Sequence, residues 1–243
     1  LLEYDDILNK QRHVVYAKRR VVLGISTPDE KAEETVELPR NNKEHILAYI
    51  DQEIEHVVSF HTEVKDSGEG DWNVNEIVQT MQTMFPFHEQ DIEQISKAAE
   101  ENQEDPMPRI GARDRIIGYC QARAREEYER VTESVFSQAP NEEVGHTVVS
   151  TIEKQIILRA MDSLWVDHLV AIQYLRTGIG LRGYAQQDPL VAYKKEAFEL
   201  FARMQETVQK EVVYAFFKIK GSMTFAPSVM QEKIVTLVGA KKD

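Results

Sequence analysis

Three side chains that can bind metals or move protons stand close together in the second half of the chain. They are Asp162, Asp167 and His168. A histidine beside two carboxylates suits a metal site or a hydrolytic centre. However, His168 also falls on an apolar stripe of helical spacing, where a histidine usually satisfies its ring nitrogens by hydrogen bonds within the core. The sequence therefore favours a structural role for His168, and an all-α hydrolase that uses these three residues is the weaker alternative.

The chain shows no other motif that is typical of catalysis or cofactor binding. The glycine-rich string GIGLRG begins at Gly178, but it follows a helical pattern and no GK[ST] comes after it, so we expect no phosphate site there. The patterns HExxH and CxxC are absent. We expect the carboxylates of Glu126, Glu127 and Glu129 to lie on a solvated face. We therefore assign no catalytic residue and no metal ligand, and we expect this chain to bind no cofactor.

The residues best suited to contact another molecule lie between two long apolar-striped segments. They are Arg182, Gly183 and Tyr184. A tyrosine between glycine and alanine has few neighbours to pack against, and its ring can stack on varied peptides while its hydroxyl forms hydrogen bonds. We predict that Tyr184 is an exposed contact with Arg182 beside it. The alternative is that its ring folds back onto the ends of the helices.

Two long helices are expected to position these contact residues. Apolar residues in Thr151–Ile219 alternate steps of three and four, which places them on one face of each helix. We expect Thr177 and Gly178 to end the first helix, and Asp188 to cap a second helix that begins at Pro189. Because the connection is short, the two helices should be antiparallel neighbours. The first stripe contains Ile157, Met161, Leu164, His168, Ala171 and Leu175, and the second contains Ala197, Phe201, Met204, Val208, Val212, Ala215 and Ile219.

A second apolar face on the first of these helices includes Trp165 and Leu169. Two helices alone rarely bury enough surface to be stable, so we expect a third helix to cover this face. The best candidate is Leu1–Leu23, which repeats apolar residues every seven positions and contains Tyr4 and Leu8. The alternative is that these residues pack against another domain.

The middle of the chain predicts shorter helices separated by acidic or proline-containing connections. Asn41 and Asn73 each precede a glutamate by three residues, which is the spacing of a capping box. No segment shows the sustained period-two alternation of a strand. We therefore predict an all-α fold, with a strand-like tail over Met223–Asp243 as an open alternative. The further expected helices are Glu89–Ala99, Arg113–Phe136 and a long helix capped by Asn141 that runs to Leu175.

The composition limits the classes of function. With 243 residues the chain can form one large or two small domains, and its net charge of −12 argues against non-specific nucleic-acid binding. The single cysteine, Cys120, excludes a disulfide within the chain and suits a reducing compartment. No apolar run approaches the roughly 18 residues that a membrane span needs, and no signal peptide is visible. Because no initiator methionine is present, we expect a fragment of a longer protein.

Three strings in the chain resemble SecA, the motor ATPase of bacterial protein export. LLEYDDILNKQRHVVYAKRR resembles the end of the long scaffold helix, and WNVNEIVQTMQTMFPF is similar to the tryptophan-led part of the helical wing. YLRTGIGLRGYAQQDPLVAYKKEAFELF resembles the two-helix finger. The resemblance implies an elongated helical scaffold with an inserted, smaller wing domain. The implied divisions are a scaffold helix at 1–28, the wing at 29–140, the scaffold and finger at 141–220, and a tail or linker at 221–243.

The same resemblance implies the partners and the role of each contact residue. In a SecA-like motor, Tyr184, Arg182 and Gly183 would contact the translocating preprotein and the SecYEG channel, with Arg176 and Ile179 setting the approach. ATP and Mg²⁺ would bind motor domains outside this chain, and the protein would act in the cytoplasm at the inner face of the plasma membrane. A homodimer and contact of basic residues with anionic lipid remain open. The alternative from another class is a stand-alone helical adaptor that binds a partner helix along a groove.

Overall fold

Every regular element in the described part of the chain is an α-helix, which confirms the all-α prediction for these residues. The computed structural model describes residues 2–24, 41–62, 72–100, 108–182 and 188–222. The strand-like tail proposed after residue 222 lies outside this range. The helices are α1 (Leu2–Leu23), α2 (Asn42–Thr62), α3 (Val74–Met84), α4 (Glu89–Glu100), α5 (Pro108–Phe136), α6 (Glu142–Arg182) and α7 (Pro189–Ser222).

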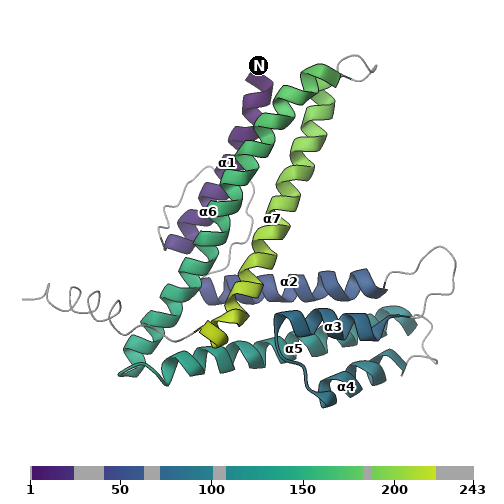
Figure 1. The fold of residues 1–243 in the computed structure, drawn as a ribbon, viewed down its shortest axis with the longest axis vertical. Coiled ribbons are helices and arrows are strands. Elements are labelled where there is room, and N and C mark those ends of the chain that lie inside the picture. The colour runs from purple at the N-terminus through teal and green to yellow at the C-terminus, as the bar shows by residue number, and fades with distance from the viewer. Residues whose placement is uncertain (1, 25–40, 63–71, 101–107, 183–187, 223–243) are drawn as a thin grey trace, which may run out of the picture.

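The helices form two groups that cross each other. In Figure 1, α1, α6 and α7 run side by side along the long axis, whereas α2, α3, α4 and α5 gather across the lower end. Pairs of contacting residues show the relative directions of these helices. From the start to the end of α1, the residue numbers of its partners rise in α7 and fall in α6. Thus α1 is parallel to α7 and antiparallel to α6. The pairs on α6 are Asp5–Arg176, Gln11–His168 and Arg19–Asp162, and those on α7 are Tyr4–Tyr193, Gln11–Ala197 and Lys18–Gln205.

Local capping residues set most of the helix starts. The side chains of Asn41, Asn73, Asn141 and Asp188 each accept a hydrogen bond from a backbone N–H in the first turn, at 2.8 to 3.1 Å. These caps confirm the four predicted starts. Gly24 ends α1 with a φ of +74°, a conformation that glycine adopts without a steric penalty.

The end of α6 differs from the prediction. We expected Thr177 and Gly178 to stop the helix, and the helix was expected to run only to Leu175, but α6 continues to Arg182. Burial explains the difference, because Ile179 in the added turn is only 3% exposed and packs with residues of α7. Such packing offsets the roughly 1 kcal/mol that a glycine costs inside a helix.

A single large apolar core joins the two helix groups, and it shifts the buried face of α7. The predicted stripe is buried from Ala197 to Val212, but Ala215 is exposed. Val213, Phe216 and Phe217 are buried in its place, because this end of α7 meets the crossing helices. The buried face moves round the helix in this way because two turns of an α-helix take slightly more than seven residues. Residues spaced by seven therefore leave the original face after about five turns.

Two further predictions on burial were wrong. Leu164 was assigned to the centre of the α6 stripe but is only half-buried, whereas its neighbour Trp165 is 7% exposed. Glu127, expected on a solvated face with Glu126 and Glu129, is 1% exposed. Arg130 stabilises its charge by an ion pair of 2.9 Å, as a buried carboxylate requires.

Candidate functional site

The predicted contact residues follow the far end of the three-helix bundle, where α6 ends and α7 begins. Gly183 and Tyr184 lie outside the described residues, and Arg182 is placed only as the last residue of α6. Their role as a contact therefore stays a prediction. The described residues just before them, Arg176 and Ile179, show how α1 holds this end of α6 in place.

A small apolar cluster joins three helices near the point where α6 ends and α7 begins. We call it the end cluster, and it consists of Ile172 and Ile179 of α6 with Tyr193 and Ala197 of α7. Tyr4 and Leu8 pack against it from α1, and the rings of Tyr4 and Tyr193 lie 4.5 Å apart. Burial raises the pKa of Tyr193, so its hydroxyl stays protonated. Ile179 thus points into the bundle and supports the end of α6 from within.

Arg176 of α6 pairs with Asp5 of α1 at the same level of the bundle. The Arg176 guanidinium donates to the Asp5 carboxylate at 3.0 Å, and both side chains are largely exposed. An exposed pair of this kind contributes at most about 1 kcal/mol to stability. The pair therefore shows where α1 lies against the last turns of α6 and adds little to the stability of the bundle.

Gln11 is the polar residue that links all three helices inside the bundle. Its side chain is 7% exposed, and its Nε2 donates to the backbone oxygen of Ala197 in α7 at 3.0 Å. The Oε1 atom of the same amide lies 2.9 Å from Nε2 of His168 in α6. Because the Gln11 nitrogen is engaged by Ala197, the oxygen must accept, and His168 carries its proton on Nε2. One side chain of α1 therefore fixes the register of α6 and α7 together.

His168 is a hydrogen-bonded core histidine, as the apolar stripe predicted. Its ring is 4% exposed and lies 5.5 Å from the ring of Trp165 and 5.6 Å from that of Phe201. Burial lowers the pKa of His168, so the imidazole is neutral at pH 7. A neutral ring satisfies Gln11 without placing a charge in the core.

The structure does not bring the proposed hydrolytic residues together. Asp162 faces α1 and pairs with Arg19 at 3.0 Å, whereas Asp167 is exposed and His168 points at Gln11. Among the described residues, no group of three histidine, cysteine, aspartate or glutamate side chains is arranged to hold a metal ion. We therefore derive no catalytic chemistry from these residues.

The face around Trp165 lies against α1. Trp165, Arg19 and Tyr16 line one groove between α1 and α6, and Leu169 is half-buried against the main core. The partner of this face in the described structure is thus a helix of the same chain. No helix in the described part is both long enough and apolar enough to span a membrane.

Comparison with known proteins decides the family of this bundle. Residues 1–220 match the family model described as the SecA Wing and Scaffold domain. The chain belongs to this SecA family. Similar curated proteins are named protein translocase subunit SecA, and three of them serve as examples. They come from Thermodesulfovibrio yellowstonii, Kineococcus radiotolerans and Desulfotalea psychrophila, with identities of 32%, 33% and 34%.

The similarity to these SecA proteins covers 90% of this chain but only 20%, 21% and 22% of the three relatives. The chain therefore spans about a fifth of the length of the curated SecA proteins that it matches. The matched part contains α1 to α7 almost completely, so the end cluster and the Gln11 link both belong to the wing and scaffold region.

The lowered pKa of His168 predicts an acid-sensitive SecA scaffold. The unfolded chain binds a proton near pH 6.5, whereas the buried ring does so only at lower pH, so the unfolded state holds more protons between these values. The stability that neutral His168 contributes is complete above about pH 7.5 and is lost as the pH falls below about 6.5. We expect the free energy of unfolding to fall by up to about 1.4 kcal/mol per pH unit from this group.

Urea melts of the chain at pH 7.5, 6.5 and 5.5 check this expectation against His168→Gln. Burial also lowers the pKa of His45, which is common to both proteins. The decline in stability on acidification should therefore be shallower in the variant but still present. Parallel declines in the two proteins would show that His168 does not titrate as proposed.

Proposed function

We propose that this chain is the wing and scaffold part of a SecA-type protein translocase. In this proposal the end of the α6–α7 pair, with Tyr184 and Arg182, contacts the polypeptide in transit at the mouth of the SecYEG channel. The observation that supports it most strongly is the SecA Wing and Scaffold match over residues 1–220. No specific observation favours the stand-alone adaptor.

The arrangement of α1 suits the transmission of movement to this end. Gln11 holds α6 and α7 from inside, and the Asp5–Arg176 pair and the end cluster hold them near the contact residues. A displacement of α1 would therefore be passed on to α6 and α7, since close-packed interiors have low compressibility and transmit strain. The contact itself needs no sequence specificity, which suits an aromatic ring and a cation.

The rest of the proposal concerns parts that lie beyond this chain. ATP with Mg²⁺ would bind motor domains of the longer protein, and this chain would hydrolyse nothing by itself. The assembled protein would work in the cytoplasm at the inner face of the plasma membrane. The exposed residues Lys194 and Lys195, near the start of α7, also suit an anionic lipid surface.

Gln11→Ala in the full-length protein tests the coupling. The change leaves the Nε2–H of His168 without its partner in a buried place, whereas the oxygen of Ala197 keeps its hydrogen bond within α7, so we expect a loss of about 2 kcal/mol in stability. We also expect ATP hydrolysis to continue while transport of a model preprotein into membrane vesicles falls severalfold.

Gln173→Ala is the matched control, because Gln173 is an exposed glutamine on α6. It should leave both the melt and the transport unchanged. Normal transport per ATP hydrolysed by Gln11→Ala would contradict the coupling role of α1, even if the family assignment stands.

A further inference from the structure

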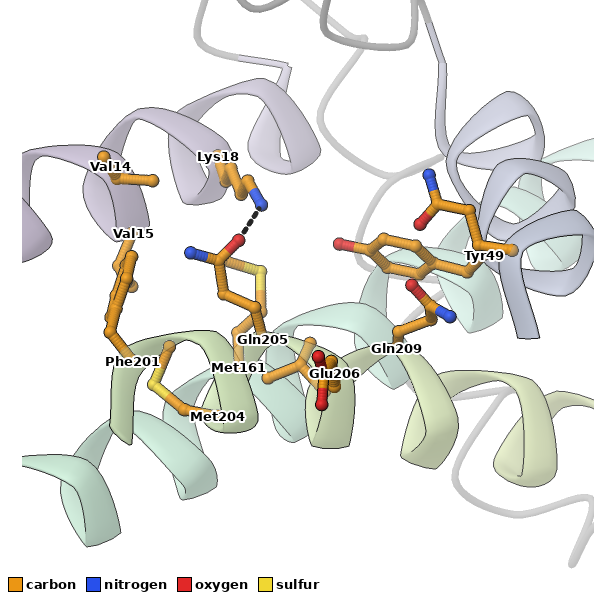
Figure 2. A pocket seen from close by; sticks show the side chains of 12 residues that line it. Val14, Val15, Lys18, Tyr49, Met161, Phe201, Met204, Gln205, Glu206 and Gln209 are labelled. Carbon is orange, nitrogen blue, oxygen red and sulfur yellow. Dashed lines mark hydrogen bonds between the residues drawn. The ribbon is translucent and has the colours of Figure 1, made fainter. Parts of the chain in front are cut away.

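A cavity lies where α1, α2 and α7 meet, at the crossing of the two helix groups. Its volume is about 140 Å³. One side is apolar and is formed by Met161, Phe201 and Met204, and Figure 2 shows these side chains together on α6 and α7. The opposite side is polar and includes Lys18 of α1 and Tyr49 of α2.

Lys18 is half-buried at this cavity, and none of the described carboxylates forms an ion pair with it. Its Nζ donates to the uncharged side chain of Gln205, Oε1, at 2.9 Å. No carboxylate of the described residues forms an ion pair with it, and Glu206 at the rim is exposed. Burial lowers the pKa of Lys18, as expected for an ammonium group that has lost water without gaining a counter-charge.

Two more polar groups near Lys18 have no hydrogen-bond partner within the described residues. The Tyr49 hydroxyl points into the space beside Gln205 in Figure 2, and within the described residues it forms no hydrogen bond. The ring of His45 lies 5.4 Å from that of Tyr49 and is 3% exposed, and its Nδ1 has no partner in the described structure. Burial is the main cause that lowers the pKa of His45, and the charge of Lys18 is the second cause, so the two groups are close. Among the described residues that line this corner, Lys18 brings a positive charge, and the carboxylate of Glu206 is exposed at the rim.

The size and the polarity of the cavity define one class of ligand. A dry cavity of about 150 Å³ accepts benzene, so this one has room for a single ring or a branched aliphatic group. A carboxylate beside Lys18 and Tyr49 would receive a charge-assisted hydrogen bond and a hydroxyl hydrogen bond. We propose that the cavity between α1, α2 and α7 binds a small carboxylate that carries one apolar, ring-sized group.

Such a ligand would hold together the three helices that meet where the two helix groups cross. It would contact Lys18 of α1, Tyr49 of α2, and Phe201 of α7, three helices that meet where the bundle crosses the shorter helices. A ligand that binds only when these helices are packed together stabilises that packing by mass action. The carboxylate belongs either to a free small molecule or to the C-terminus of a peptide, and both present the same chemistry.

Saturation-transfer NMR with phenylacetate and the full-length protein tests the site. Phenylacetamide has the same shape without the charge, and we expect it to bind about tenfold more weakly. Lys18→Met should weaken phenylacetate binding by a similar factor, and Tyr49→Phe by less. Lys195→Met, which removes an exposed lysine of α7, should leave the affinity unchanged.

A short peptide that ends in phenylalanine identifies the source, because it competes with phenylacetate only if the cavity admits a chain terminus. Equal binding of phenylacetate and phenylacetamide, which needs no variant, would overturn the proposal. A phenylacetate signal no larger than that of a protein-free control would also overturn it. So would an unchanged affinity for phenylacetate in a folded Lys18→Met protein. Weaker binding in Lys18→Met with a native circular dichroism spectrum supports it.

Discussion

Tyr184→Ala in the full-length protein is expected to reduce the transport rate on the order of tenfold while leaving the fold intact. The residue lies between Gly183 and Ala185, in the connection that follows the last residue of α6. Small neighbours leave its ring few groups to pack against, so we expect a loss of stability below about 1 kcal/mol. A contact that moves unfolded chains of any sequence needs an adhesive surface, which an aromatic ring supplies and a methyl group does not.

The measurement is ATP-dependent passage of a model preprotein into membrane vesicles, with a thermal melt of each variant beside it. Tyr184→Phe and Tyr184→Trp keep a ring and should retain much more transport than Tyr184→Ala. A large drop in melting temperature for Tyr184→Ala would favour the alternative that the ring folds back onto the helix ends.

Phe216→Ala is expected to cost about 3–5 kcal/mol of unfolding free energy, the largest loss of stability that we predict. Phe216 is 1% exposed and stacks on Tyr128 of α5, with ring centroids 4.7 Å apart and planes 10° from parallel. The Tyr128 hydroxyl donates in turn to the buried carboxylate of Glu153. Burial is the main cause that raises the pKa of Tyr128, and this hydrogen bond is the second cause. Removal of the ring leaves a cavity at the point where α7 joins the crossing helices.

Phe198→Ala is the matched control, because Phe198 lies on the same helix and is 71% exposed. Its change in stability should stay within about 0.5 kcal/mol. Urea melts of this chain give both values. Similar midpoints for Phe216→Ala and the unchanged chain would mean that the end of α7 is not held by the crossing helices.

Most of the helices follow from local chemistry, which explains why the sequence predicted them. The caps at Asn41, Asn141 and Asp188 act within one turn, and the apolar stripes need only the helical period. The errors occurred where distant residues decide. Gly178 has the residue type of a helix end, but the helix continues because Ile179 packs in the end cluster. Ala215 has the spacing of a core position, but it is exposed because the crossing helices cover another face of α7.

The candidate site divides in the same way. His168 was correctly interpreted as a core histidine, because its spacing on the stripe indicated burial and burial demands a partner. The partner itself, Gln11, was missed. A glutamine on a helix usually faces water, and the only signal was its position between Leu8 and Val15, which lie on the buried face of α1. The sequence predicted the helix Arg113–Phe136, but not that its residues Cys120 and Tyr128 enter the core that α5 shares with α6 and α7.

The central claim is that the end of the α6–α7 pair contacts the polypeptide in transit. Disulfide formation between Tyr184→Cys, in a full-length protein without other accessible cysteines, and a stalled preprotein with one cysteine tests it directly. Gln155→Cys, at an exposed site in the other half of α6, is the control. We predict an ATP-dependent cross-link at position 184 and none at position 155. No cross-link at position 184, or equal cross-links at both positions, would contradict the account.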